Sequence, residues 1–180
     1  MMPAQLAERL QAPISKAEAG ALAGNLRTRP AELLQFLPLL ASDQPGVAWR
    51  MAWILATLAE RRFRPPKGYA EGLAQALAKT AEPAVARCIG RALLALPPYG
   101  HELEGIVADA CLAWLDDPGV PVSTASIMID LYLELCHRYP ELWRELEPRL
   151  ERLSRHDGTG WTATLGKARR FYHLNLAHKR

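Results

Sequence analysis

The fold of this chain is decided by residues 31–58, which read AELLQFLPLLASDQPGVAWRMAWILATL. Two apolar segments flank a short polar turn, SDQPG. In the second segment, apolar side chains recur at Val47, Met51, Ile54 and Leu58, which is the spacing of one face of an α-helix. The stretch therefore predicts a helix, a turn and a second helix.

This pattern returns twice, each time after 38 residues. Pro45, Pro83 and Pro121 mark the interval, and a period in this range is typical of helical solenoid repeats. Proline is favoured in the first turn of a helix, where its missing N–H has no intrahelical partner in any case. We therefore expect each proline in or beside such a turn, with Ser42 and Thr80 as helix N-caps three residues earlier. Three sets of apolar residues keep the same register: Met51, Ile89 and Ile127; Leu55, Leu93 and Leu131; Leu39, Leu77 and Leu115.

Several stretches resemble the signature of the HEAT-repeat family of α-solenoids: LLQFLPLL at 33–40, DQPGV at 43–47, RMA at 50–52, and the turns EPAV at 82–85 and DPGV at 117–120. The resemblance covers residues 31–138. The basic residue that follows the turn valine in the family is displaced here, to Arg50 and Arg87, and is absent from the third unit. Asp130 and Glu134 also interrupt the apolar pattern of that unit, so we expect its second helix to be rotated.

The resemblance implies an all-α fold, a right-handed α-α superhelix of stacked helix pairs. We expect one solenoid domain over residues 1–180, with capping helices at 1–30, three helix pairs at 31–138 and capping helices at 139–180. Ser15 and Glu18 have the spacing of a capping box and predict a helix from Lys16 to Arg27. Further helices are expected at 31–41, at 141–155 and from Trp161 onward.

Charge and cysteine content narrow the classes of function. The net charge is +3, but residues 161–180 alone contribute +5 and residues 1–160 sum to −2, so the broad basic surface of a nucleic-acid-binding protein is missing. The three cysteines, in apolar surroundings, predict buried thiols in a reducing compartment. We expect a cytoplasmic protein, since neither a signal peptide nor a membrane-spanning segment is visible. The basic residues of the terminal segment are Lys167, Arg169, Arg170, Lys179 and Arg180; the cysteines are Cys88, Cys111 and Cys136.

No pattern predicts a catalytic, metal or cofactor site. His101, Glu102 and Glu104 lack a further ligand at helical spacing. Glu134 and His137 have the spacing of a di-iron ligand pair, but the second pair that such a site needs is missing. The glycines near Lys167 do not have the spacing of a phosphate-binding loop.

Trp49, Trp53, Arg87 and Arg91 form the candidate binding face. At 100° per residue, both tryptophans lie opposite the apolar stripe of their helix. The 38-residue interval places Arg87 and Arg91 at the corresponding positions of the next repeat, so that the four side chains share neighbouring helices. Arginine over tryptophan is a favourable cation–π pair, and both residue types are enriched at binding hot spots. The alternative is that the tryptophans only fill the space between repeats.

Two functional hypotheses follow. The first is a non-enzymatic HEAT-like scaffold that binds a protein or peptide partner, with a second copy of the chain as one candidate partner. The second is a nucleic-acid-binding protein related to the HEAT-like DNA alkylation-repair glycosylases, in which Trp49, Trp53 and an acid such as Asp130 would act on a damaged base. The net charge of residues 1–160 favours the first, because phosphate binding requires many lysines and arginines on one face.

Overall fold

The computed structural model describes residues 2–61 and 63–176, and every regular element in these residues is a helix. The all-α prediction is confirmed for this part of the chain. Packing divides the chain into two compact units, Met1–Leu103 and Glu104–Arg180, and each unit is described by itself. That residues 1–180 form one solenoid domain remains a prediction.

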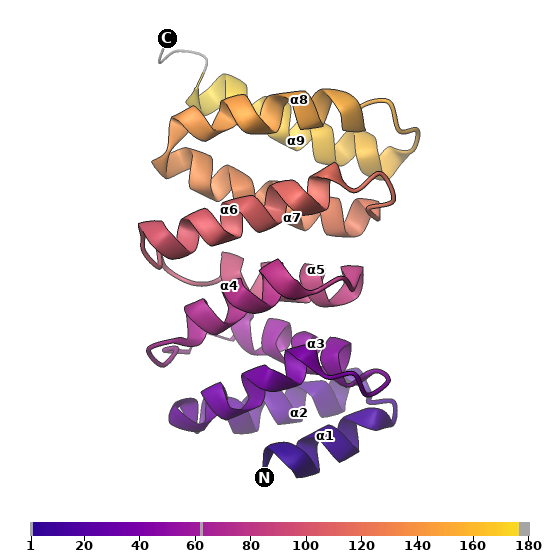
Figure 1. Ribbon diagram of the computed structural model, residues 1–180, viewed down its shortest axis with the longest axis vertical. Coiled ribbons are helices and arrows are strands. Elements are labelled where there is room, and N and C mark those ends of the chain that lie inside the picture. Colours follow the sequence, from indigo (N-terminus) through magenta and orange to yellow (C-terminus); the bar gives the residue numbers. More distant parts are fainter. Residues whose placement is uncertain (1, 62, 177–180) are drawn as a thin grey trace. The chain divides into compact units, whose positions relative to one another are not determined.

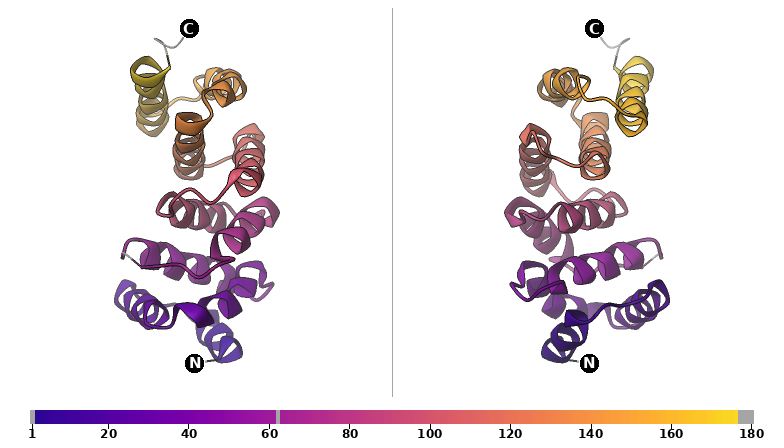
Figure 2. Two further views of the ribbon diagram at one scale, coloured as in Figure 1. Left: turned by 90° about the vertical axis from the view of Figure 1, so that its left-hand side faces the viewer. Right: turned by 90° about the vertical axis from the view of Figure 1, so that its right-hand side faces the viewer.

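Helices of the first unit pack in adjacent pairs, which form two rows (Figures 1 and 2). The first row holds α1, η1 and α4, and the second row holds α2, α3 and α5. Within the second row, α3 packs against both α2 and α5, while η1 and α4 pack on α3 and α5 from the first row. The bounds are α1 Pro3–Gln11, α2 Lys16–Arg27, the 3₁₀ helix η1 Pro30–Ala41, α3 Val47–Ala59, α4 Tyr69–Lys79 and α5 Pro83–Leu94.

The core of the first unit lies between these rows. It is formed by the apolar stripes that the sequence predicts: Leu33, Met51, Ile54, Leu55, Leu73 and Ile89 are all 0% exposed. Complete burial of a side chain of this size contributes about 1.5–3 kcal/mol relative to exposure. The helices are therefore held mainly by their shared apolar faces.

The three prolines that define the repeat lie where they were predicted. Pro83 is the first residue of α5, Pro45 precedes the Gly46 N-cap of α3, and Pro121 is the N-cap of α7 (Val122–Arg138) in the second unit. Each therefore stands in or beside the first turn of a helix, where the missing N–H costs no helical hydrogen bond.

The prediction that Ser42 and Thr80 are N-caps is wrong. Each is instead the C-cap of the preceding helix, and its hydroxyl accepts a hydrogen bond from the backbone N–H two residues later, at 3.3 Å from Gln44 and 3.2 Å from Glu82. Such local bonds shape a turn before the next helix begins. By contrast, Ser15 does cap α2, because its Oγ accepts from the Glu18 N–H at 3.1 Å.

The segment predicted as an ordinary helix at 31–41 is a 3₁₀ helix over Pro30–Ala41. Pro38 lies inside it and has no N–H to donate to the carbonyl four residues earlier. The apolar spacing that predicted the element still buries Leu33, Phe36 and Leu40, so the prediction was right about the buried face and wrong about the helix type.

The second unit also has two rows, with α6 and α8 in one and α7 and α9 in the other (Figure 2). α7 packs against α9 and against the short 3₁₀ helix η2. The helix predicted at 141–155 is divided into η2 and α8. The bounds are α6 His101–Asp116, which begins in the first unit, α7 Val122–Arg138, η2 Pro140–Leu142, α8 Trp143–Leu153 and α9 Thr159–Asn175.

Two carboxylates tie the helices of the second unit together. Asp116, at the end of α6, accepts hydrogen bonds from Arg149 and Arg152, both at 2.7 Å. Glu104 is only 3% exposed, and its carboxylate pairs with Arg138 at 3.0 Å and accepts from the Tyr139 hydroxyl at 2.9 Å. Arg138 and Tyr139 thereby stabilise the buried carboxylate of Glu104, because a buried charge without such partners is strongly unfavourable.

All three cysteines are buried and have free thiols. Within residues 2–61 and 63–176, no helix has the length and apolar character that a membrane crossing requires.

Candidate interaction surface

The two tryptophans of the candidate face lie one helical turn apart on α3. Their rings are stacked, with centroids 5.8 Å apart and planes 16° apart. Both side chains are half-buried, whereas Met51 and Leu55 on the opposite side of α3 are 0% exposed. Trp49 and Trp53 thus form an aromatic ledge beside the core, partly covered by the unit and partly accessible.

The turn before α3 sets the position of this ledge. Gly46 has φ +78°, in the left-handed region that glycine adopts at little cost. A β-carbon on Gly46 would overlap the guanidinium of Arg50. That guanidinium donates to the backbone carbonyls of Leu10 at 2.6 Å and Gln11 at 3.2 Å, at the end of α1.

Arg50 also supplies the cation over the ledge. Its guanidinium carbon lies 5.2 Å from the centroid of the Trp49 ring. In the sequence Arg50 stands out only as a displaced basic residue of the HEAT signature, and neither contact was predicted. The sequence carried no signal for these contacts, because the carbonyls that Arg50 reaches belong to α1, which is separated from α3 in the chain by α2 and η1.

The two arginines of the candidate face lie on α5, which packs beside α3. Arg87 is half-buried and hydrogen-bonds the side chain of Cys88, where its charge offsets part of the pKa increase that burial causes for this thiol. Arg91 is exposed and forms an ion pair with Glu60, just beyond the end of α3. The structure thus brings all four residues onto adjacent helices, but Arg91 is engaged by an acid. That they act as one binding face remains a prediction.

A further arginine crosses the second row. Arg61 is exposed and lies along α2, where a β-carbon built at Gly20 or Gly24 would be 3.0 or 3.2 Å from its terminal nitrogens. Because Gly20 and Gly24 have no side chains, the Arg61 guanidinium can lie against the surface of α2.

The residues considered as metal ligands do not converge. Among the described residues, no group of three or more histidine, cysteine, aspartate or glutamate side chains could hold a metal ion. His101 and Glu102 are exposed at the start of α6, whereas Glu104 is engaged with Arg138 and Tyr139.

The residues considered for nucleic-acid chemistry are also engaged. Asp130 of α7 forms an ion pair with Lys167 of α9, so the acid that would imitate a glycosylase carboxylate already has a cation. Arg169 and Arg170 are exposed on α9. Lys179 and Arg180 lie outside the described residues.

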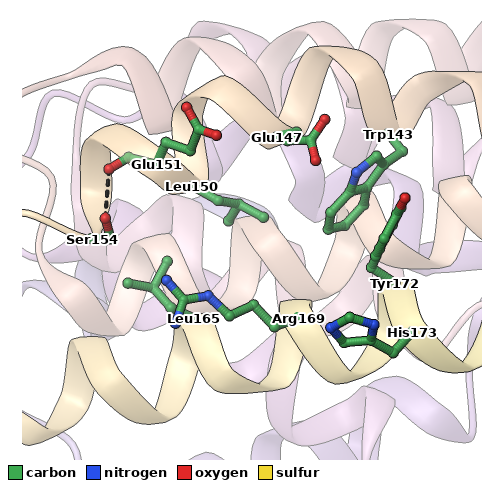
Figure 3. A pocket seen from close by; sticks show the side chains of 9 residues that line it. All are labelled: Trp143, Glu147, Leu150, Glu151, Ser154, Leu165, Arg169, Tyr172 and His173. Atoms are coloured by element: carbon green, nitrogen blue, oxygen red, sulfur yellow. Dashed lines mark hydrogen bonds between the residues drawn. The ribbon is translucent and has the colours of Figure 1, made fainter. Parts of the chain in front are cut away.

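A cavity of about 340 Å³ between α8 and α9 was not predicted (Figure 3). At one end Trp143 stacks on Tyr172, with ring centroids 4.9 Å apart. The indole nitrogen of Trp143 is buried and has no hydrogen-bond partner in the part of the chain that the structure describes. Helical spacing predicts which helix faces are apolar, but it does not predict that the facing sides of α8 and α9 leave a cavity between them. The remaining lining residues are Leu150, Leu165 and Ser154, with Glu147 and Glu151 from α8 and Arg169 and His173 from α9.

Comparison with protein families matches residues 6–163 to the HEAT repeat domain. The chain belongs to the HEAT repeat family, as the resemblance at residues 31–138 predicted. Searches of curated proteins and of solved structures found no significant match.

Proposed function

We propose that this protein is a non-catalytic scaffold that binds a protein or peptide partner through Trp49, Trp53, Arg87 and Arg91. The observation that carries the proposal is the half-buried, stacked tryptophan pair on a helix whose opposite side already fills the core. Large aromatic side chains dominate binding energy where a partner excludes water from them. HEAT repeats generally serve as protein-interaction scaffolds, which agrees with this role.

The arginines support the same proposal. Arg87 and Arg91 lie on the helix beside the tryptophans, and Arg91 keeps its side chain at the surface through Glu60. An exposed ion pair contributes only about 0–1 kcal/mol to stability. Arg91 can therefore exchange Glu60 for an acid of a partner at little cost.

The first test separates a binding surface from internal packing. A fully buried tryptophan replaced by alanine costs about 3–5 kcal/mol. Because both tryptophans are half-buried, we expect Trp49→Ala and Trp53→Ala each to cost less than about 3 kcal/mol in denaturant unfolding, with Leu55→Ala as the buried reference. Losses from both tryptophans at the full core value would assign the pair to packing.

The second test asks whether the surface captures a partner. The full chain is used as bait in lysate of the source cells, with bound proteins identified by mass spectrometry. Partners retained by the unaltered chain should be lost from Trp53→Ala and from the double variant Arg87→Ala, Arg91→Ala. Arg144→Ala with Arg155→Ala, two exposed arginines of the second unit, is the matched control. Equal capture by all these variants would show that the partner binds elsewhere.

A further inference from the structure

Charge is divided unevenly between the two rows of the first unit. Counted over the helices alone, the second row has a net charge of +4 and the first row −1. The asymmetry is local, since residues 1–160 as a whole are slightly negative. The second row carries Lys16, Arg27, Arg50, Arg87 and Arg91 against Glu18; the first row carries Arg9 and Lys79 against Glu8, Glu32 and Glu71.

The acidic residues on and next to the second row, Glu18 and Glu60, already form ion pairs with arginines. Glu18 pairs with Arg9 of α1 at 2.5 Å, and Glu60, just past α3, pairs with Arg91. Arg61 adds a further exposed cation that lies across α2. The positive charge therefore exceeds what this row's own acids neutralise, and carboxylates of a partner would complement it.

We infer that the second row of the first unit docks an acidic peptide segment of a partner protein that carries an aromatic or aliphatic anchor residue. The anchor packs against the Trp49–Trp53 ledge, and the flanking carboxylates face the arginines of α5 and Arg61. This inference rests on the proposed function and adds the chemistry of the partner.

A peptide fits these observations better than nucleic acid does. Arg50 is committed to the carbonyl end of α1, and the remaining arginines of this surface, Arg61, Arg87 and Arg91, are few for the many phosphate contacts that a nucleic acid makes. The tryptophans stack on each other, whereas proteins that bind single strands present aromatic rings on which successive bases stack. A peptide with two or three carboxylates beside one apolar anchor requires fewer cations on the protein than a nucleic acid with its repeated phosphates does.

The test starts from an unbiased peptide-display library selected against the full chain. We expect the selected peptides to be enriched in aspartate and glutamate next to an aromatic or aliphatic residue. Peptides without acidic enrichment, or no selected peptide, would overturn the inference.

The strongest selected peptide, labelled with fluorescein, is then measured by anisotropy. Arg87→Gln with Arg91→Gln should weaken binding at least tenfold, Trp53→Ala should do the same, and the matched pair Arg144→Gln with Arg155→Gln should have little effect. Affinity should fall as salt is raised. Circular dichroism establishes that each variant is folded. A peptide that binds the arginine variant as well as the unaltered chain overturns the inference, and so does a single-stranded DNA of equal length that binds more tightly.

The two proposals fail in different ways. A cellular partner that needs Trp49 and Trp53 but binds independently of salt and of both arginines would leave only the tryptophan part of the scaffold proposal standing, and would remove the acidic partner. A partner indifferent to the tryptophans and the arginines would remove both.

Discussion

Arg50 connects three features of the first unit: the turn glycine, the end of α1 and the tryptophan ledge. Its guanidinium occupies the space beside Gly46, donates to Leu10 and Gln11, and lies over Trp49. A cation at the C-terminal end of a helix stabilises the carbonyls that have no intrahelical partner. One side chain thus links the start of α3 to the end of α1 and to the Trp49 ring.

We predict that Gly46→Ala destabilises the protein. Its left-handed backbone costs an alanine about 1–2 kcal/mol, and the new β-carbon also displaces Arg50. The free energy of unfolding in urea measures the effect. Gly105→Ala is the control, since a β-carbon there meets nothing within 4 Å inside a helix, so alanine should be neutral or stabilising. Equal effects of the two changes would refute this account of the turn.

The buried thiols allow a second residue-scale prediction. Burial raises the pKa of Cys111 and of Cys88, and raises that of Cys136 to about 12. Thiolate is the reactive form, so at about pH 8 Ellman's reagent should react with none of them rapidly in the native protein and with all three in denaturant. As pH rises, Cys88 should react first, because Arg87 and Arg91 lower its pKa against burial.

The sign of the linked stability change follows from the same pKa values. Thiols whose folded pKa lies above the unfolded value stabilise the fold below the unfolded pKa and lose that contribution as pH rises. Stability should therefore fall above about pH 8.5. Arg87→Gln with Arg91→Gln should slow the reaction of Cys88 further. A native protein in which Cys111 reacts before Cys88 would contradict the assignment.

At the scale of elements, apolar spacing predicted where the helices lie because buried faces dominate their stability. The helix Lys16–Arg27 was predicted with its observed bounds, since Ser15 and Glu18 give a local signal. The N-cap prediction for Ser42 and Thr80 failed because a hydroxyl forms the same kind of hydrogen bond when it caps a helix and when it closes a turn. The type of η1 was missed because the effect of Pro38 depends on the surrounding backbone.

The candidate face was only partly predictable at this scale. Helical angles placed Trp49 and Trp53 away from the apolar stripe, and both lie beside the core. Arg50 lies over Trp49 while it is bonded to a backbone carbonyl of α1, and Arg91 is engaged by the Glu60 side chain just past α3. Periodicity within one helix carries no information on such contacts between helices. For the same reason the α8–α9 cavity was missed.

At the scale of the whole molecule, two compact units predict two regions of separate stability. Repeat proteins are stabilised by each repeat and its neighbours, so a local change affects mainly its surroundings. Leu55→Ala, in the first unit, should cost about 2–5 kcal/mol and raise amide hydrogen exchange chiefly within residues 2–61 and 63–103. Leu146→Ala should do so within residues 104–176, since both leucines are 0% exposed. Uniform acceleration by either variant would show one cooperative unit.

Nucleic-acid binding provides the remaining whole-molecule prediction. Lys167 is paired with Asp130, residues 1–160 sum to −2, and their local excess of cations on the second row of the first unit is too small for the many phosphate contacts of a nucleic acid. Duplex and single-stranded DNA should therefore bind only non-specifically, at about 10⁻⁴ M or weaker in physiological salt. Filter binding or anisotropy with the full chain measures this. Sub-micromolar, salt-sensitive binding that disappears when Lys167, Arg169 and Arg170 are replaced would favour the glycosylase-related alternative instead.

The contact of Arg61 with Gly20 and Gly24 of α2 has a consequence for folding during synthesis on the ribosome. Gly20 and Gly24 each cost α2 about 1 kcal/mol relative to alanine, and a helix of 12 residues is marginal in isolation. The side chain that fills the space over these glycines comes from residue 61. We therefore expect residues 16–27 to stay largely unfolded on the ribosome until α3 and Arg61 have left the exit tunnel. On this expectation α2 becomes stable only after α3, which is translated later.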